Sequence, residues 1–411
     1  MIISQVAKQR IPALDFATEK ASSGRYGIHD YPAMLHYLVV RTLLNKYGGK
    51  KHILYDPFCG SGVSLCEGLR KGMVAFGTDI NPLALLIASV RCSNNIKEVP
   101  TRKLMNEVKD VAPDVPEVKN IEYWFKDYVI EDLGRLRATI KKYSEEQYYE
   151  LLLVAFSQTV RDVSNNRKGE FKRFRLSEDK LETFCPQVLA VFEKNLTSYI
   201  DKTIEDSIPE GRKYIFRSDV RKGIPFSKKV DMVITSPPYG DSRTTVAYGQ
   251  FSSFSLDWLK GLNPFGDADL TLDTYSLGGK RVEYKVDFSK TLEKVYRKLA
   301  RLNPKRANDV KAFYIDLFTA CKNIVDILNN KAIVCFVVGN RTVNNLQIPM
   351  DEIVKEIFEC LGLRHKETLI REIYNKRMPL QNSPTNITGK KASTMKHEYI
   401  VVMEKRNSDK S

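Results

Sequence analysis

The sequence predicts an α/β fold built on a mostly parallel sheet, and three observations support this prediction. Short apolar runs alternate along the chain with amphipathic stretches of helical length. The strongest run, 331–338, is almost wholly apolar, as strands covered by helices on both faces usually are. Several runs end in turns that contain glycine, proline or an acid, and open α/β sheets bind ligands at the carboxyl ends of their strands. Apolar residues make up 43% of the 411 residues, so a large core is expected and global disorder is not.

The first 95 residues contain one complete βαβ unit after an unpatterned start. Residues 1–24 show no strand or helix period, and we expect an irregular leader there. Residues 34–44 form the first stretch of helical period. The elements expected beyond it are a strand at 52–55, a helix at 63–71, a strand at 73–78 and a helix at 83–90.

A glycine-containing loop joins the first of these strands to its helix: Asp56-Pro57-Phe58-Cys59-Gly60-Ser61-Gly62. Glycine lets the backbone approach a ligand closely, and the helix that follows points free N–H groups at that ligand. Leu65 stands where a dinucleotide-binding loop has its third glycine, and the Lys-Ser/Thr pair of a phosphate-binding loop is missing. Asp79 ends the next strand, where an acid typically binds ribose hydroxyls. The pocket therefore favours a nucleoside-like ligand without phosphate, and S-adenosylmethionine fits that description.

The region 97–210 does not continue the βαβ alternation. Residues 131–145 and 147–163 have helical period with charged faces, so we expect a mostly helical insertion. Within it, 161–175 holds six basic and two acidic residues, interleaved with two phenylalanines. Basic side chains beside aromatic rings suit a nucleic-acid contact, although a solvated basic loop would have the same composition.

The α/β alternation resumes after residue 210. A strand at 213–216 leads to Asp219, which either contacts the ligand or forms a turn, and a strand at 232–234 leads to a Pro-Pro turn. Residues 280–306 hold ten basic and three acidic residues, and they suit either a nucleic-acid contact or a solvated helix face. The elements expected in the rest of the chain are helices at 290–302, 309–328 and 350–361, and strands at 331–338, 366–373 and 398–404.

The Pro-Pro turn, Ser236-Pro237-Pro238-Tyr239, is stiff because its prolines fix the backbone and supply no N–H. A hydroxyl stands before the prolines and an aromatic ring after them. Read alone, this is an ordinary turn that ends a strand. Together with the glycine loop at another strand end, it favours a ligand-binding role.

The loop from Asp56 to Gly62, together with Thr235-Ser236-Pro237-Pro238-Tyr239, resembles the paired signatures of the exocyclic-amino DNA methyltransferases. The resemblance implies a Rossmann-like sheet of the S-adenosylmethionine-dependent methyltransferase kind, in which the glycine loop binds the cofactor and the Pro-Pro turn holds the target base. Serine before the prolines is most similar to the cytosine-N4 branch, whereas aspartate is commoner among adenine-N6 enzymes. The segment from His29 to Ala33 resembles the one that closes over the methionine part of the cofactor. The cofactor-binding residues expected in this chain are Tyr31, Asp56, Phe58, Gly60, Gly62, Asp79 and Asp219.

The resemblance covers a discontinuous catalytic domain at 25–96 and 211–405. The 97–210 insertion matches no signature of the family. No sizeable domain follows the last expected strand, so we expect the element that reads the DNA sequence to be inserted. The candidates are the helical insertion at 97–210 and the region 241–306, and the choice between them stays open.

The chemistry implied by the Pro-Pro turn is direct methyl transfer to an exocyclic amine. The lone pair of that amine is delocalised into the ring. Hydrogen-bond acceptors must therefore bind the hydrogens of the amine to make the nitrogen nucleophilic. Ser236 Oγ and the Pro237 carbonyl are the expected acceptors, Pro238 stiffens the turn, and Tyr239 is expected to stack on a base flipped out of the duplex. Transfer is then an in-line displacement that depends on positioning, without a covalent intermediate or a catalytic cysteine.

A net charge of +15 favours a polyanionic partner, and we expect double-stranded DNA. The chain has no apolar run of about 18 residues and no signal-peptide core, so we expect a cytoplasmic protein without membrane contact. The seven cysteines are scattered without a C-x-x-C pair, so no metal site is expected. The resemblance also implies a restriction–modification role, with a cognate endonuclease acting separately. The expected DNA contacts are Arg167, Lys168, Lys172, Arg173, Arg243, Arg341, Lys376 and Arg377.

Three other functions stay open at this point. An adenine-N6 methyltransferase needs only a small change in the base pocket, and serine before the prolines does not exclude it. An RNA methyltransferase would need an RNA-binding module, and the sequence shows no OB or KH pattern. A non-catalytic DNA-binding protein could retain the same fold, but the intact glycine loop and Pro-Pro turn argue against it.

Overall fold

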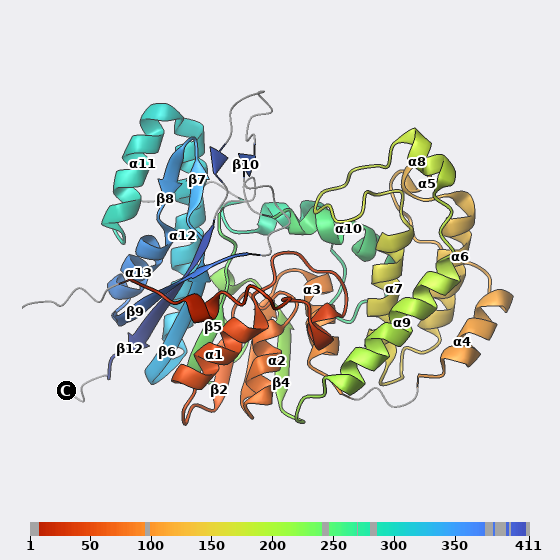
Figure 1. Cartoon of the computed structure of the whole chain (residues 1–411), viewed down its shortest axis with the longest axis horizontal. Helices are drawn as coiled ribbons and strands as arrows, with labels where there is room; N and C mark the ends of the chain where they lie inside the picture. Colours follow the sequence, from red (N-terminus) through yellow and green to blue (C-terminus); the bar gives the residue numbers. More distant parts are fainter. Residues whose placement is uncertain are drawn as a thin grey trace, which may run out of the picture.

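The computed structural model describes residues 8–94, 99–240, 246–268, 270–279, 286–374, 381–382, 392–393 and 396–407. Its main feature is an eight-stranded sheet in the order β1-β9-β12-β6-β5-β2-β3-β4 (Figure 1). The strands of this sheet are β1 (Lys8–Arg10), β2 (Ile53–Asp56), β3 (Val74–Asp79), β4 (Lys213–Arg217), β5 (Val230–Thr235), β6 (Leu328–Val338), β9 (Leu363–Glu372) and β12 (His397–Lys405).

Strand direction places one edge of the sheet at the ligand site. The five strands from β4 to β6 are parallel, so their carboxyl ends share one edge. β12 lies between β6 and β9 and is antiparallel to both, so its first residues and the last residues of β9 lie at that same edge. The α/β fold with a mostly parallel sheet, predicted from the alternation of apolar runs, is confirmed.

The expectation of an irregular leader at 1–24 is wrong for β1, which pairs in parallel with β9. This strand has no apolar pattern because it is an edge strand made of Lys8, Gln9 and Arg10, and none of the three is buried. Lys8 Nζ lies 2.5 Å from the buried carboxylate of Asp351, and this ion pair helps to hold β1 against the sheet.

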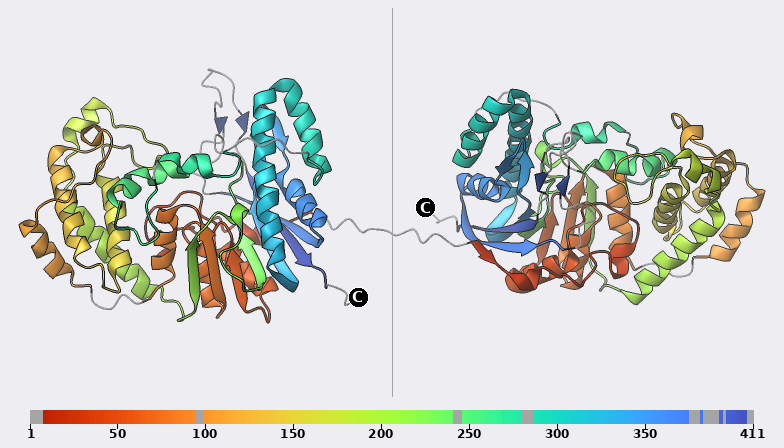
Figure 2. Two further views of the ribbon diagram at one scale, coloured as in Figure 1. Left: turned by 180° about the vertical axis from the view of Figure 1, so that it is seen from behind. Right: turned by 45° about the horizontal axis from the view of Figure 1, so that its top comes forward.

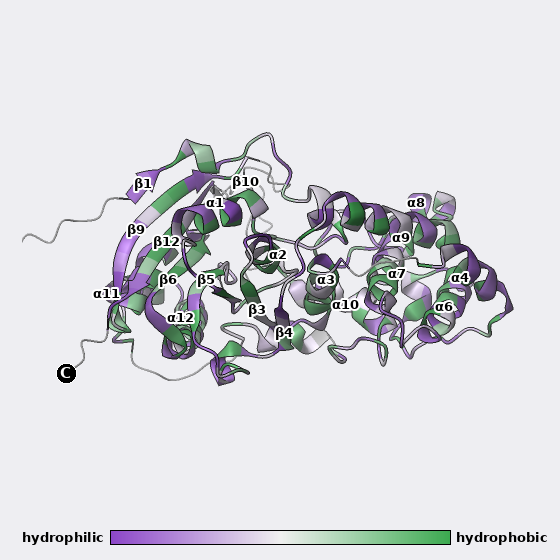
Figure 3. Ribbon diagram, turned by 90° about the horizontal axis from the view of Figure 1, so that it is seen from below, coloured by the Kyte–Doolittle hydropathy of each residue, from purple (hydrophilic) through white to green (hydrophobic). Residues whose placement is uncertain are grey.

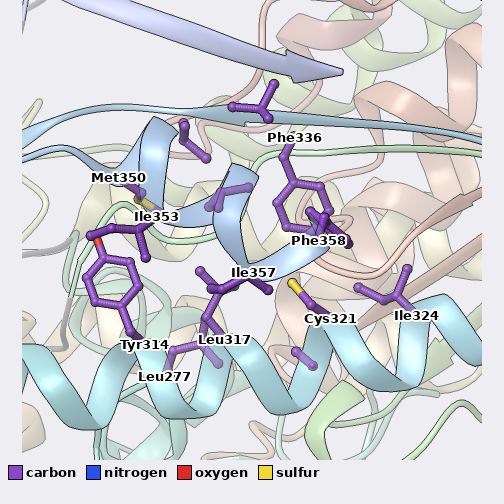
Figure 4. Packing of buried hydrophobic residues seen from close by; sticks show 14 of the residues in the cluster. Leu277, Tyr314, Leu317, Cys321, Ile324, Phe336, Met350, Ile353, Ile357 and Phe358 are labelled. Carbon is purple, nitrogen blue, oxygen red and sulfur yellow. The ribbon is translucent and has the colours of Figure 1, made fainter. Parts of the chain in front are cut away.

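Helices cover both faces of the sheet, as Figure 3 shows from below. Alternate residues of β5 and β6 point to opposite faces: Met232 and Cys335 pack in one core cluster, whereas Val233 and Phe336 pack in the other. The first cluster includes side chains of α1 (Tyr37–Tyr47) and α2 (Val63–Arg70). The second includes α11 (Lys290–Leu302), α12 (Pro304–Asp326) and α13 (Met350–Cys360). Figure 4 shows α13 packed between α12 and Phe336 of β6.

The segment 99–205 is helical, and it forms the end of the molecule farthest from α11 (Figure 2). Its helices are α4 (Thr101–Glu107), α5 (Ile121–Trp124), α6 (Asp127–Lys141), α7 (Tyr149–Val163), α8 (Glu178–Thr183) and α9 (Val188–Glu205). Their core also takes in α3 (Pro82–Arg91) and α10 (Tyr248–Trp258). Every residue of α3 is buried, because the helix lies between the sheet and the insertion. Part of the region 241–306, namely α10, thus belongs to the core of the insertion.

The remaining elements are short. The strands among them are β7 (Arg341–Val343), β8 (Leu346–Ile348), β10 (Gln381–Asn382) and β11 (Ala392–Ser393). The 3-10 helices are η1 (Pro12–Leu14), η2 (Gly24–Gly27), η3 (Val108–Asp110), η4 (Val220–Lys222) and η5 (Leu270–Tyr275). Within the described part of the chain, every helix is too short or too polar to cross a membrane.

Candidate active site

A pocket opens at the carboxyl ends of β2, β3 and β5, and it encloses about 990 Å³ when its open mouth is included. The glycine loop and the Pro-Pro turn, far apart in sequence, both line it. The lining also includes residues 31–35, 79–81 and 218–221, and parts of the segment 248–277.

The glycine loop has the backbone that its sequence predicts. Gly60 and Gly62 have φ angles of +48° and +82°, in the left-handed region that favours glycine. A Cβ on Gly62 would lie 2.7 Å from the Cβ of Ala88, so only glycine lets α2 pack this closely on α3. Gly62 is the N-cap of α2 and, among the described residues, no side chain caps this helix. Its first N–H groups thus remain available to an anionic group such as the carboxylate of an amino acid.

Asp79 connects the glycine loop to the end of β3. Its Oδ2 accepts a hydrogen bond from Gly60 N at 2.9 Å, and its Oδ1 accepts one from Asn81 N at 2.9 Å. Burial raises the pKa of Asp79, and backbone donors offset part of this rise. A carboxylate offers about four lone-pair positions, so Asp79 can still accept hydrogen bonds from ribose hydroxyls.

Asp56 holds the glycine loop and the Pro-Pro turn together. Its Oδ1 accepts hydrogen bonds from Thr235 Oγ1 at 2.5 Å and from Phe58 N at 3.0 Å, and its Oδ2 accepts one from Ser64 Oγ. Burial raises the pKa of Asp56 to about 6, although these donors favour the carboxylate. The carboxylate thus links the ends of β2 and β5, and its expected contact with the cofactor stays a prediction.

Tyr31 and Asn81 attach α10 to the pocket. The Tyr31 ring stacks on Tyr248 with centroids 6.0 Å apart. Asn81 Nδ2 donates to Ser252 Oγ at 2.9 Å and to Tyr31 Oη at 3.3 Å. Sequence reasoning missed Tyr248 and Asn81 as pocket residues, although Asn81 before Pro82 is a recognisable helix N-cap.

Asp219 lines the pocket, but its carboxylate already has partners. It caps η4 and forms an ion pair with Arg221 at 2.8 Å. Arg221 in turn lies 2.6 Å from Asp316 of α12. The expected contact of Asp219 with the ribose or adenine stays a prediction, and the geometry also gives this residue a bracing role.

Arg91, which sequence reasoning missed, joins two walls of the pocket. Its guanidinium is fully buried and donates to Ser61 Oγ at 2.6 Å, to Ile28 O at 2.7 Å and to His29 O at 3.0 Å. Burial lowers the pKa of Arg91 to about 10. Arg91 therefore ties the glycine loop to the segment that precedes Tyr31. The signal in the sequence was a cation at the end of an otherwise apolar helix.

The Pro-Pro turn begins at the end of β5. Ser236 and Pro238 line the pocket, Pro237 is buried, and Tyr239 packs partly against the core on the α12 side of the sheet. Ser236 Oγ donates to Tyr239 Oη at 2.9 Å, and Tyr239 Oη donates to Glu398 Oε1 at 3.1 Å. Burial, reinforced by Glu398, raises the pKa of Tyr239 well above its usual value. Stacking of Tyr239 on a base stays a prediction.

The candidate DNA contacts differ in their surroundings. Arg167, Lys168 and Lys172 are exposed on the loop that follows α7. Arg173 is largely enclosed: its Nε donates to Ser253 Oγ at 2.5 Å, its Nη2 lies 3.2 Å from Asp257 Oδ2, and its guanidinium lies 4.2 Å from the Phe254 ring centroid. These contacts attach the loop to α10. The other candidates are Arg341, which begins β7, and Arg243, Lys376 and Arg377, which lie outside the described residues.

Over the ranges that the structure describes, no group of three His, Cys, Asp or Glu side chains is placed to hold a metal ion. The donors in the pocket are instead hydroxyls, carboxylates and backbone N–H groups. This set fits an adenosine and amino-acid ligand of the kind that the glycine loop predicts.

Comparison with known proteins assigns the chain to a family. No family model matches the sequence. The Type II methyltransferase M.MvaI of Kocuria varians is 33% identical over an alignment 439 positions long, which covers 95% of this chain and 93% of that protein. The Type II methyltransferase M.MjaII of Methanocaldococcus jannaschii is 28% identical over 156 residues, which cover 35% of this chain and 29% of that protein.

Similarity to solved structures is weaker. The rRNA methyltransferase AviRa of Streptomyces viridochromogenes aligns with 92% of this chain and 88% of its own, at 11% identity and a TM-score of 0.31. A SAM-dependent methyltransferase of Methanosarcina mazei aligns with 89% of this chain and 97% of its own, at 8% identity and a TM-score of 0.32. The fold assignment therefore rests on the sheet topology, and the family assignment on the full-length similarity to M.MvaI. The chain belongs to the Type II DNA methyltransferase family, and S-adenosylmethionine is the cofactor expected in its pocket.

Proposed function

We propose that the protein methylates the exocyclic N4 of a cytosine flipped out of duplex DNA, within a specific recognition sequence. The observation that carries this proposal is that Ser236, the residue before the two prolines, lines the same pocket as Gly60 and Asp79. A hydroxyl acceptor thus lies in the pocket that the cofactor would occupy. Adenine N6 is the alternative target, because its exocyclic amine presents the same hydrogens to Ser236.

The residues present fit the cofactor. The amino-acid part would lie against Gly60, Gly62 and the free N–H groups of α2, and the ribose would lie against Asp79. The Tyr31–Tyr248 stack supplies an aromatic wall. When bound, S-adenosylmethionine supplies a methyl group on a sulfonium centre, whose loss leaves a neutral thioether.

Ser236 and Pro237 would prepare the amine of the base. Each accepts a hydrogen bond from the amine, Ser236 through Oγ and Pro237 through its carbonyl, which makes the nitrogen more tetrahedral and aims its lone pair at the methyl carbon. Once the nitrogen carries the methyl group, it loses one of its two hydrogens as a proton to water. Pro237 and Pro238 keep the direction of these acceptors fixed, because their φ angles cannot vary. The contribution of the protein is thus mainly one of orientation.

Duplex DNA would contact cations near the pocket. The loop with Arg167, Lys168 and Lys172 is attached through Arg173 to α10, and the first residue of α10, Tyr248, lines the pocket. This connection makes the helical insertion the better candidate for reading the DNA sequence. Methylation would protect the recognition sequence from a cognate endonuclease that acts as a separate protein.

Nucleoside mass spectrometry tests the proposal. Duplex DNA of mixed sequence is incubated with the protein and S-adenosylmethionine, digested to nucleosides and compared with DNA treated with Ser236→Ala. We expect N4-methylcytosine with the unchanged protein and far less with the variant. N6-methyladenine without N4-methylcytosine would overturn the cytosine assignment in favour of the alternative.

A further inference from the structure

Ser236 is the first member of a hydrogen-bonded chain that ends on a carboxylate from the last strand of the sheet. Ser236 Oγ donates to Tyr239 Oη, and Tyr239 Oη donates to Glu398 Oε1. Glu398 pairs in register with Arg371 of β9, whose Nε lies 3.2 Å from Glu398 Oε2. Since β12 is antiparallel to β6, its second residue lies at the edge where β5 ends, beside the Pro-Pro turn.

The direction of these hydrogen bonds follows from the chemistry of Glu398, where they end. A carboxylate only accepts hydrogen bonds, so the Tyr239 proton must point at Glu398. Tyr239 Oη then serves as the acceptor for Ser236, and the Ser236 proton must point at Tyr239. Ser236 Oγ thereby keeps its lone pairs free for a donor in the pocket, and accepting a hydrogen from an exocyclic amine requires this state.

We propose that Glu398 is a positioning residue for methyl transfer: through the Tyr239 hydroxyl it fixes the Ser236 hydroxyl so that Oγ accepts a hydrogen from the target amine. This inference rests on the proposed function, because it concerns the same Ser236. It gives the Tyr239 hydroxyl a role that is separate from stacking by its ring. Arg371 holds the Glu398 carboxylate at the catalytic edge of the sheet.

Two substitutions break the hydrogen-bonded chain from Ser236 to Glu398 at different points. Tyr239→Phe keeps the ring and removes one oxygen, which leaves the Ser236 proton free to turn toward the amine. Glu398→Gln keeps the size of the side chain, but Arg371 favours the amide oxygen, so the NH₂ group faces Tyr239. The NH₂ group then donates to Tyr239 Oη, which reverses the direction of the hydrogen bonds. Glu404→Gln is the matched control, because Glu404 pairs with Arg364 across the same two strands at their other end.

Single-turnover methyl transfer to duplex DNA measures the effect. We expect Tyr239→Phe and Glu398→Gln each to slow transfer about tenfold or more, the loss typical of a hydrogen bond to a charged group. The cofactor Kd and the KM for DNA should stay within about twofold of wild type, because neither side chain is expected to touch the cofactor or the DNA backbone. Glu404→Gln should transfer methyl groups at the wild-type rate.

The double variant Tyr239→Phe/Glu398→Gln separates positioning from general damage to the structure. Once Tyr239 has no hydroxyl, Glu398 cannot act on Ser236, so the double variant should be no slower than the slower single variant. A rate loss in the double variant equal to the product of the two single losses would contradict the inference. A Tyr239→Phe protein that transfers methyl groups at the wild-type rate would contradict it as well. If Glu398→Gln lowers the melting temperature, the single-turnover rate of the Tyr239→Phe protein alone tests the inference. A wild-type protein that methylates no DNA would instead contradict the proposed function.

Discussion

The two turns that line the pocket are held in different ways. The glycine loop, Asp56 to Gly62, is held mostly by residues of its own βαβ unit: Gly60 bonds to Asp79, and Asp56 bonds to Ser64 as well as to Thr235 of β5. The Pro-Pro turn, Ser236 to Tyr239, bonds instead to Glu398, 159 residues beyond Tyr239. The glycine loop is therefore organised mostly by local contacts, whereas the Pro-Pro turn depends on the completed sheet.

Loss of the Tyr239 side chain affects the Pro-Pro turn alone, and it should have the largest effect on methyl transfer. Tyr239→Ala removes both the stacking ring and the hydroxyl, so we expect single-turnover methyl transfer to fall by about 100-fold or more. The cofactor Kd, measured by calorimetry, should change by less than about twofold. Equal losses in binding and transfer would show that the two turns are not separate.

Asp56 begins the glycine loop and bonds to Thr235, the residue before the Pro-Pro turn, and its effect should appear in the pH dependence of stability. The pKa of this carboxyl rises from 3.8 to about 6 on burial, so between these values the folded protein binds more protons than the unfolded chain. Stability should therefore fall as pH rises from about 4 to about 6, by up to about 3 kcal/mol from this group. Urea unfolding across this range should show that Asp56→Asn lacks this part of the decline. An identical pH dependence in both proteins would contradict the raised pKa.

A substitution of Asp79 tests the glycine loop alone. Asp79→Ala removes the acceptor expected for the ribose and the partner of Gly60, so we expect the cofactor Kd to rise about 10- to 100-fold. With saturating cofactor, the single-turnover rate should recover to within several-fold of wild type. An unchanged Kd would refute the assignment of Asp79 to the ribose.

Lys172 belongs to neither turn and should give the smallest effect. Lys172→Ala should weaken DNA binding by a few-fold and reduce the slope of log K against log salt concentration by about 0.9, the loss of one phosphate contact. The control is Lys50→Ala, because Lys50 is exposed just before β2, at the opposite edge of the sheet. Equal effects of both variants would place the DNA elsewhere.

The contrast between contacts within one βαβ unit and contacts with distant strands explains which features the sequence could predict. The glycine loop, Asp79 and the βαβ order are local patterns, and the structure confirms their arrangement. Glu398 could not be predicted, because a glutamate in a strand near the end of the chain has no local signal for a partner in the turn that follows β5. The edge strand β1 was missed because its residues are polar, and α10 was not assigned to the core of the insertion because that packing is between distant segments.

The side chains that act as braces were the hardest to predict. Arg173 was expected on DNA from its place in a basic loop, yet it packs against α10. Asp56 was expected on the cofactor, and its carboxylate bonds to Thr235 of the neighbouring strand. In both cases the composition indicated a charged side chain without indicating its partner, because the partner comes from another part of the fold.

Single-molecule sequencing of DNA from cells that express the protein tests the central claim most directly, because it reports the modified base, its position and the surrounding sequence together. We expect N4-methylcytosine at one position of a single recognition sequence, and its absence from cells that express Ser236→Ala. Modified adenine at that sequence, or the same modification with Ser236→Ala, would contradict the account.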